Sequence, residues 1–207
     1  MKFENTSVYN IYNAILGARN PMNSWNKSDS VFNGYDGKIE NTVIGKKDMK
    51  LLQSLIKAGS EHRKFMRQIG VSVTITAPLY WWKEFDTYKV GTVANSTSTM
   101  HKLASTPITR ECFEEPDLMW SDVINRLEET RLRYIASKCN SDWKELIVNL
   151  PESWLQLRTV TMNYENVLNM VQQRINHKLS EWSKSFIEWA RSLPYAQELI
   201  FMGDVDG

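Results

Sequence analysis

The sequence predicts an α+β fold that is mostly helical and has a small central antiparallel sheet. Several segments repeat apolar residues at helical spacing, whereas Ile69, Val71, Val73 and Ile75 alternate with small or hydroxylated residues, the period of two typical of a strand. The chain has 207 residues, 42% of them hydrophobic and 24% charged, which is enough for one hydrophobic core. We therefore expect a single domain over residues 1–207.

The first third of the chain combines two helices with a long loop. Ser7 can cap a helix that continues to Leu16, because the apolar residues that follow it recur every three or four positions. Residues 18–45 are rich in Asn, Ser, Gly and Asp and include the turn signals Asn33-Gly34 and Asp36-Gly37, which favours an irregular loop. A second helix is expected from Lys46 to Ala58, followed by Gly59.

The middle of the chain begins with the strand at 69–76. Pro78 then suits the first turn of a helix that is expected to reach about Tyr88. Residues 90–99 are small and hydroxylated; such a run can bring several hydrogen-bond donors to one ligand, or it can be a plain capping turn.

Four helices are expected in the second half of the chain. Their apolar positions repeat with a period near 3.6 residues, and Ser121 or Asp122 can cap the first of them. The expected ranges are 123–135, 142–150, 157–175 and 180–193.

Charge and hydropathy exclude several classes of protein. Twenty-five basic and 24 acidic residues give a net charge of +1, which provides no long-range attraction for nucleic acid. No apolar run approaches the roughly 18 residues of a membrane span, and the first residues lack the apolar core of a signal peptide. We therefore expect a cytoplasmic protein with no nucleic-acid or membrane partner.

The metal-binding and nucleophilic residue types form no short motif. His62, His101 and His177 lack the spacing of a metal site, so no metal is expected. Cys112 and Cys139 are too far apart for a C-x-x-C motif, and each is interpreted as a small apolar core residue. The catalytic residues therefore stay unknown.

The polar face of the helix expected at 157–175 is the best candidate binding surface. At about 100° per residue, positions eleven apart differ by only about 20°, so Asn163 and Arg174 would share one face, about 16 Å apart along the axis. An amide and a guanidinium on one face could bind an elongated anionic ligand, with His177 nearby. A solvated polar stripe is the alternative interpretation.

The order of segments from about Lys46 to Trp182 resembles that of the flavin-dependent thymidylate synthases. In that family a helix precedes a Glu-His pair, then come a strand, a helix, a hydroxyl-rich signature and a late helix with Asn and Arg. The corresponding residues here are Ser60-Glu61-His62, Ala77 to Phe85, Asn95-Ser96-Thr97-Ser98-Thr99-Met100, Leu150-Pro151, Asn163 and Arg174.

Parts of the family signature are replaced in this chain. Thr87-Tyr88-Lys89 stands where the family has Arg-His-Arg, so Lys89 is the only cation left there. Met100 stands in place of an arginine and Ser96 in place of a glutamate. Each lost charge-assisted contact to a phosphate is worth about 1.5–3 kcal/mol, so the replacements bear directly on activity.

The resemblance implies a homotetramer that binds FAD and a pyrimidine deoxynucleotide, dUMP. It further implies NADPH and methylene-tetrahydrofolate as co-substrates for transfer of a methyl group to uracil, with chemistry carried by the cofactor. Residue by residue, it implies cofactor-binding roles for His62, Lys89, Thr92, Asn95 and Asn163, and substrate-binding roles for Ser96, Ser98 and Arg174.

Two alternatives belong to other functional classes. The chain could be a non-catalytic nucleotide-binding or protein-interaction protein, of the kind that phages encode, which kept the fold. It could also be a helical oligomeric scaffold with no small-molecule site. Production of deoxythymidylate from dUMP would count against the first alternative, and a ligand response that depends on Asn163 and Arg174 would count against the second.

Overall fold

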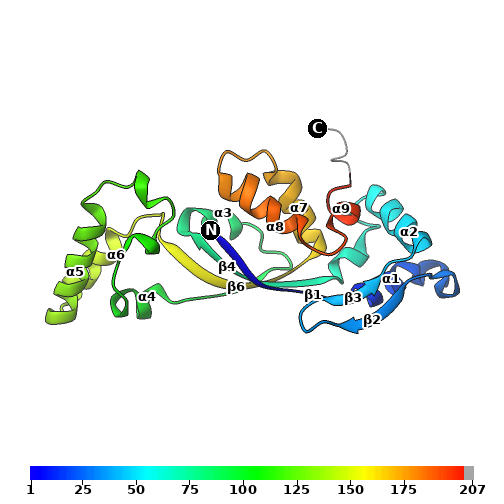
Figure 1. The fold of residues 1–207 in the computed structure, drawn as a ribbon, viewed down its shortest axis with the longest axis horizontal. Coiled ribbons are helices and arrows are strands. Elements are labelled where there is room, and N and C mark those ends of the chain that lie inside the picture. Colours follow the sequence, from blue (N-terminus) through cyan, green and yellow to red (C-terminus); the bar gives the residue numbers. More distant parts are fainter. Residues whose placement is uncertain (203–207) are drawn as a thin grey trace. The chain divides into compact units, whose positions relative to one another are not determined.

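The computed structural model describes residues 1–202 and divides the chain into two compact units (Figure 1). Unit 1 comprises residues 1–2, 75–87 and 95–158. Unit 2 comprises the described residues of 3–74, 88–94 and 159–202. The mixture of helices with a small sheet confirms the predicted α+β class, whereas a single domain over 1–207 stays a prediction.

Two sheets contain the strands of the described chain. The larger sheet has the order β1-β4-β6-β5, and the smaller pairs β2 with β3 in antiparallel fashion. The strand predicted at 69–76 is confirmed as β4. Its first two residues are buried, and buried residues then alternate with partly exposed ones. The bounds are β1 (Lys2–Tyr9), β2 (Val31–Tyr35), β3 (Glu40–Val43), β4 (Gly70–Pro78), β5 (Val93–Ser96) and β6 (Leu155–Asn163).

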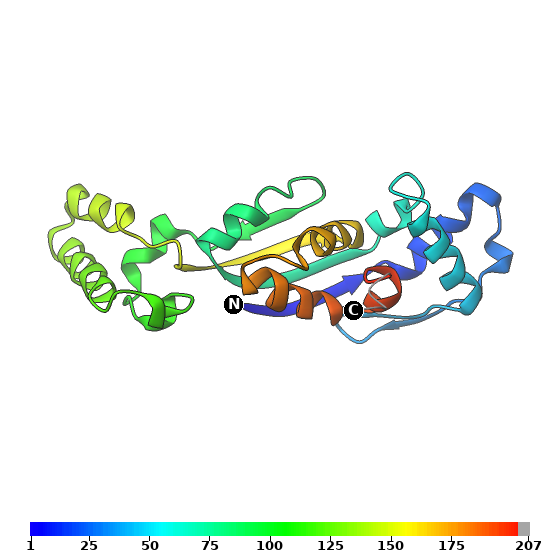
Figure 2. The same ribbon diagram turned by 90° about the horizontal axis from the view of Figure 1, so that it is seen from above.

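Unit 2 places helices against one face of its strand segments. Val71 and Val73 of β4 and Val160 of β6 are fully buried, while the alternate hydroxylated residues are more exposed. Figures 1 and 2 show α7 and α8 on the same side of these strands. The helices are α1 (Ile11–Arg19), α2 (Lys46–Lys57), α7 (Tyr164–Arg174), α8 (Ile187–Arg191) and α9 (Ala196–Leu199), with 3-10 turns η1 (Asn20–Met22), η2 (Trp25–Lys27) and η3 (Lys64–Arg67) and the π-helical turn η7 (Glu181–Phe186).

Unit 1 has a separate hydrophobic cluster. Its fully buried members include Leu127 and Leu146, from the two helices that pack side by side in Figure 1, and Phe113 from the preceding loop. Trp81 and Trp82 are also buried. The helices are α3 (Leu79–Phe85), α4 (Thr99–Lys102), α5 (Val123–Ser137) and α6 (Asn140–Val148), with 3-10 turns η4 (Leu103–Ser105), η5 (Arg110–Cys112) and η6 (Pro116–Leu118).

The helix predicted at 157–175 is wrong over its first half. Residues 155–163 form β6, and only the part from Tyr164 to Arg174 is helical. Val160 and Met162 are buried while Thr159 and Thr161 are exposed, so this segment buries every second residue as a strand does. The apolar residues of the strand and of the helix fall by chance into one helical pattern.

The predicted N-terminal helix is also misplaced, because residues 2–9 form β1 and α1 begins at Ile11. Asn10 has a φ of 71°, a conformation that separates the strand from the helix. The Glu40 carboxylate accepts hydrogen bonds from the backbone N–H groups of Ile11 (3.0 Å) and Tyr12 (2.7 Å). The helix is therefore capped by a distant residue and not by Ser7.

The segment 18–45, predicted as an irregular loop, contains the β2–β3 hairpin. The Asp36 side chain accepts hydrogen bonds from the backbone N–H groups of Lys38 (3.1 Å) and Ile39 (2.8 Å), which closes the turn. Gly37 has a φ of 102°, a conformation that glycine adopts readily. Asp36-Gly37 forms the hairpin turn, as the sequence predicts, whereas the second predicted turn, Asn33-Gly34, is wrong because these residues lie within β2, where the register with β3 is irregular. The two strands were missed because they have only five and four residues.

The prediction that both cysteines are apolar core residues is wrong for Cys139, which is exposed, while Cys112 is half-buried. Cys139 precedes α6, and its thiol lies 3.0 Å from the Ser141 hydroxyl. No helix in the described part of the chain is long and apolar enough to cross a membrane.

Candidate functional site

Helix α7 in unit 2 is the centre of the candidate site. Its N-terminus is closed by a capping box, in which Asn163 Oδ1 accepts from the Asn166 backbone N–H (3.0 Å) and Asn166 Oδ1 accepts from the Asn163 N–H (3.1 Å). These reciprocal bonds satisfy donors that the first turn of a helix leaves open. Strand β6 therefore passes into α7 at a fixed angle, and Asn163 is the last residue of the strand.

Residues 88–92 lie along α7 and contact both of its ends. Tyr88 donates its hydroxyl hydrogen to Gln173 Oε1 (2.9 Å), near the C-terminus, and Asn166 Nδ2 donates to the Val90 carbonyl (2.7 Å), near the N-terminus. Gly91 has a φ of 78°, and a Cβ at this position would lie 3.0 Å from Asn163 Nδ2. The segment 88–92 approaches the helix this closely because Gly91 has no side chain.

Arg174, the last residue of α7, is held by two aromatic side chains. Its Nε donates to the Tyr88 hydroxyl oxygen (2.8 Å), and its guanidinium carbon lies 4.9 Å from the centroid of the Trp182 ring. The same carbon lies 5.6 Å from the Tyr88 ring centroid. A guanidinium over an aromatic face is stabilised by about 0.5–2 kcal/mol, so the orientation of this cation is set before any ligand binds.

Two further arginines surround Glu165 in the first turn of α7. Arg63 Nε lies 3.0 Å from Glu165 Oε1, and Arg67 Nε forms a second short ion pair with Glu165 Oε2. Arg63 also donates to Asn169 Oδ1 (3.1 Å). Burial opposes the ionised form of Glu165, but the hydrogen bonds from Arg67 and Arg63 outweigh it and lower its pKa. Glu165, through its hydrogen bond and its charge, and Glu61, through its charge, raise the pKa of Arg67, so two carboxylates oppose the two guanidinium groups here.

Several residues that the sequence pointed to gather around α7. Asn163 and Arg174 bracket the helix, so the prediction that both lie within one helical face is wrong, because Asn163 is outside the helix. Thr92 donates its hydroxyl hydrogen to the Tyr88 carbonyl through a short bond, which fixes the shape of segment 88–92. Lys89 is exposed in the same segment, and His62 is exposed in the turn before Arg63.

Asn95, Ser96 and Ser98 belong to unit 1. Asn95 and Ser96 are exposed residues of β5, and Ser98 caps the short helix α4. Ser98 Oγ accepts from the His101 backbone N–H (3.2 Å) and lies 2.7 Å from His101 Nδ1. These contacts account for the local turn, and the proposed ligand-binding roles of the three residues stay predictions.

The sequence analysis missed Arg63, Arg67, Glu165 and Asn166, and it did not foresee the contact of Tyr88 with Arg174. The Asn-x-x-Asn spacing of Asn163 and Asn166 is a capping signal that could have located the start of α7. The contact of Tyr88 with Arg174 and the ion pair of Arg63 with Glu165 join positions 86 and 102 residues apart. Short sequence motifs and periodicity cannot predict contacts between residues so far apart in the chain.

The surroundings of α7 provide chemistry that suits an anionic ligand. Guanidinium groups, amide side chains and an exposed lysine supply hydrogen-bond donors, and positive charge exceeds negative charge among the named groups. Arginine binds phosphate through paired N–H donors. Among residues 1–202, no group of three His, Cys, Asp or Glu side chains is arranged to hold a metal ion.

The fold is similar to that of two solved thymidylate synthases. Thymidylate Synthase X (ThyX) from Helicobacter pylori with FAD and dUMP matches with a TM-score of 0.74 and 16% identity over 100% of both chains. Flavin-dependent ThyX from the same organism, complexed with FAD and dUMP, matches with a TM-score of 0.71 and 17% identity over 98% of both chains. No protein-family model and no curated protein matches the sequence. The chain therefore has a ThyX-like fold.

Proposed function

We propose that this protein binds FAD and dUMP as a divergent relative of the flavin-dependent thymidylate synthases. The observation that carries the proposal is the full-length similarity to two structures that hold both ligands. The donor set around α7 supports it, because dUMP and FAD carry phosphates and this helix is bordered by Arg63, Arg67 and Arg174. Arg67 has a side chain that is 45% exposed, so it can reach a ligand in solvent.

The side chains near α7 include cations and hydrogen-bond donors of the kind that bind the phosphates of a nucleotide. Arg174 supplies a guanidinium whose direction is set by Tyr88 and Trp182, and Lys89, which follows Tyr88 in the sequence, supplies an exposed ammonium. Asn163 and His62 are assigned to the flavin, and Thr92 holds segment 88–92 in shape. In unit 1, Asn95 is assigned to the flavin and Ser96 and Ser98 to dUMP.

The proposal includes a reaction. Bound flavin would supply the hydride for reductive methylation of uracil, with methylene-tetrahydrofolate as carbon donor and NADPH as reductant. The chain's own residues would bind the phosphates, orient the uracil ring and exclude water. A homotetrameric assembly and a cytoplasmic location belong to the same proposal.

A thermal-unfolding experiment tests the binding proposal. FAD or dUMP at about 100 times its dissociation constant stabilises the folded protein by about 2.7 kcal/mol, which raises the midpoint by about 5–10 °C for a chain of this size. Arg174→Gln should lose most of the shift with dUMP, measured against its own unliganded midpoint. Arg110→Gln, which removes an exposed guanidinium from unit 1, should keep the full shift. No shift with either ligand for the unmodified chain would contradict the proposal.

A non-catalytic ligand-binding protein is a second candidate. It is favoured by Tyr88, which stands within the segment that replaces Arg-His-Arg and whose hydroxyl is engaged by Arg174 and Gln173. The two candidates differ in one measurement, the formation of deoxythymidylate from dUMP, FAD, NADPH and methylene-tetrahydrofolate. Product that depends on the added protein supports the enzyme, whereas ligand binding without product supports the second candidate.

A further inference from the structure

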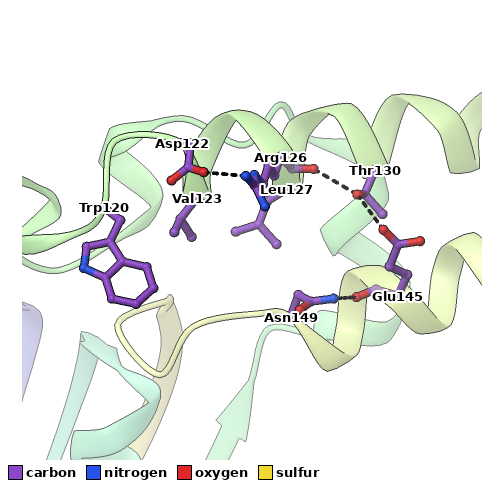
Figure 3. A pocket seen from close by; sticks show the side chains of 8 residues that line it. All are labelled: Trp120, Asp122, Val123, Arg126, Leu127, Thr130, Glu145 and Asn149. Carbon is purple, nitrogen blue, oxygen red and sulfur yellow. Dashed lines mark hydrogen bonds and ion pairs between the residues drawn. The ribbon is translucent and has the colours of Figure 1, made fainter.

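A pocket of unit 1 lies between α5, α6 and the loop before α5 and has a volume of about 370 Å³ (Figure 3). Its charges are compensated within the protein, because Asp122 pairs with Arg126 at 2.8 Å and Glu145 forms a short ion pair with Arg133. A charged ligand would first have to displace one of these partners. A more open set of polar groups in unit 1 lies in the turn that follows β5.

The turn after β5 is fixed against β6 by hydrogen bonds. The Thr97 backbone N–H donates to the Leu157 carbonyl (2.9 Å), and Gln156 Nε2 donates to the Thr97 carbonyl (3.0 Å). Ser98 follows directly and is half-buried, whereas His101 is exposed to solvent. The backbone that carries Ser98 is therefore held in place before any ligand binds.

Ser98 and His101 form a hydrogen-bonded pair within this turn. Ser98 Oγ accepts from the His101 backbone N–H (3.2 Å) and lies 2.7 Å from His101 Nδ1. A neutral imidazole has one nitrogen without a hydrogen, so either Nδ1 takes the hydroxyl hydrogen of Ser98 or Nε2 is a bare acceptor. In a protonated imidazole both nitrogens donate, so Nδ1 donates to Ser98 Oγ and the hydroxyl hydrogen is released toward another acceptor. Proton uptake by His101 therefore adds a positive charge and one outward hydrogen-bond donor at the same place.

Two ion pairs and a lysine border this turn. The ion pairs lie on the elements packed against it and are Arg131–Glu128 of α5 and Arg158–Asp86. Each pair compensates its own charge. Lys102, on the same segment, follows His101 and is exposed. A lysine stays charged between about pH 5 and 8, whereas a histidine changes its charge within this range.

We infer that protonated His101, together with Ser98, binds the phosphate of dUMP. The inference rests on the proposed function, which assigns Ser96 and Ser98 to that nucleotide. A phosphate monoester has a charge of about −1.5 to −2 at pH 7 and accepts several hydrogen bonds, which matches a cation beside a released hydroxyl hydrogen. Binding of dUMP to this chain therefore tightens as the pH falls through the range in which histidine is protonated.

Calorimetric titration of the full chain with dUMP at about pH 8 and about pH 6 tests this inference. At the lower pH the unmodified protein should bind dUMP about 10-fold more tightly than His101→Gln does, because the variant lacks one charge-assisted contact. At the higher pH the two proteins should have similar affinities. Protonation of the phosphate itself affects both proteins alike, so the comparison isolates His101.

Two more variants separate the proton from the position. His101→Arg has a permanent charge and should bind dUMP about 10-fold more tightly than the unmodified protein at the higher pH. Lys102→Gln removes the neighbouring exposed cation and should keep the difference in affinity between the two pH values.

The outcomes distinguish this inference from the proposed function. Binding of dUMP with the same pH dependence in the unmodified protein and in His101→Gln would overturn the inference and leave the proposed function intact. A His101→Arg variant that binds no more tightly than the unmodified protein at the higher pH would also overturn it. Absence of dUMP binding at both pH values would overturn the inference and the proposed function together.

Discussion

Buried carboxylates join distant segments of unit 2. Asp48 is fully buried and accepts hydrogen bonds from Arg19 (2.6 Å), from the Ser28 hydroxyl (2.7 Å) and from the Ser30 hydroxyl (2.6 Å). Glu40 caps α1, and Glu165 holds two arginines beside α7. A buried charge is costly without hydrogen-bond partners. Each of these carboxylates therefore favours the one arrangement of segments that supplies its partners.

Asp48 gives a prediction about pH. Burial raises its pKa, but the hydrogen bonds from Ser30, Ser28 and Arg19 outweigh burial and lower the pKa below its usual range. A lowered folded-state pKa stabilises the protein above the unfolded-state pKa of about 4, and this contribution is lost as the pH falls below that value. Asp48→Asn should therefore flatten the acid limb of stability measured by urea unfolding between pH 3 and 7.

The same variant should lower the free energy of unfolding at pH 7 by about 3–5 kcal/mol, because it leaves the buried Arg19 guanidinium without its counter-charge. Asp117→Asn is the control, since its side chain is 86% exposed and its ion pair with Arg110 is worth about 0–1 kcal/mol. Equal losses in the two variants would contradict the role assigned to Asp48.

Tyr88 gives a prediction about binding. Tyr88→Phe keeps the ring but removes the oxygen that accepts from Arg174 Nε, so the guanidinium loses part of its orientation. Because its donor is a charged guanidinium, this hydrogen bond is worth about 1.5–3 kcal/mol, and we expect the partial loss of orientation to weaken dUMP binding about 3- to 10-fold by calorimetry. Tyr134→Phe in α5 is the matched control and should bind dUMP normally. Unchanged affinity in Tyr88→Phe would show that this contact does not position Arg174 for the ligand.

At the scale of elements, the close approach of segment 88–92 to α7 depends on Gly91. Gly91→Ala would place a Cβ at a φ of 78° and 3.0 Å from Asn163 Nδ2 and Asn166 Oδ1. Gly34→Ala meets a similar φ of 87° but has nothing within 4 Å. Both variants should lose about 1–2 kcal/mol from backbone strain, and Gly91→Ala should lose more because it also disturbs the capping box. Urea unfolding measures the difference, and a larger loss in Gly34→Ala would contradict this account.

The elements also show what sequence can predict. The strand at 69–76 and the helices at 46–58 and 123–135 were found because each buries one face with a single period. The strand 155–163 was missed because it passes into α7 with no Gly or Pro between them, and the apolar residues of both elements line up at helical spacing. Strand β1 was missed because most of its residues are polar and its partners are distant in sequence.

The candidate site was predicted only in part for the same reason. Asn163 and Arg174 lie at the two ends of α7, but the predicted geometry is wrong, since a strand and a cap replace half of the helix; their binding roles stay predictions. The contacts of Tyr88 with Arg174 and of Arg63 with Glu165 were not predicted because the partners lie 86 and 102 residues apart. The periodicity of a sequence shows which face of a helix or strand is buried. It does not show which distant residues come into contact, because those contacts depend on how the chain folds.

At the scale of the whole molecule, each unit has its own buried residues. Leu146 lies in the cluster of unit 1 and Leu52 in the core of unit 2, and both are fully buried. Truncation of either to Ala should cost about 2–5 kcal/mol. We expect Leu146→Ala to speed hydrogen exchange mainly in α5 and α6, and Leu52→Ala mainly in α1 and α2. Equal loss of protection throughout the chain in both variants would indicate one cooperative domain instead.

Flavin binding is the claim on which the proposed function depends most. The most direct test is an equilibrium titration of FAD with the full chain, followed by quenching of flavin fluorescence, with and without dUMP. The account predicts saturable quenching at micromolar or lower protein concentration and a change in the affinity for dUMP when FAD is bound, as expected for two ligands of one site. FAD fluorescence that stays unquenched up to 100 μM protein, with and without dUMP, would contradict it.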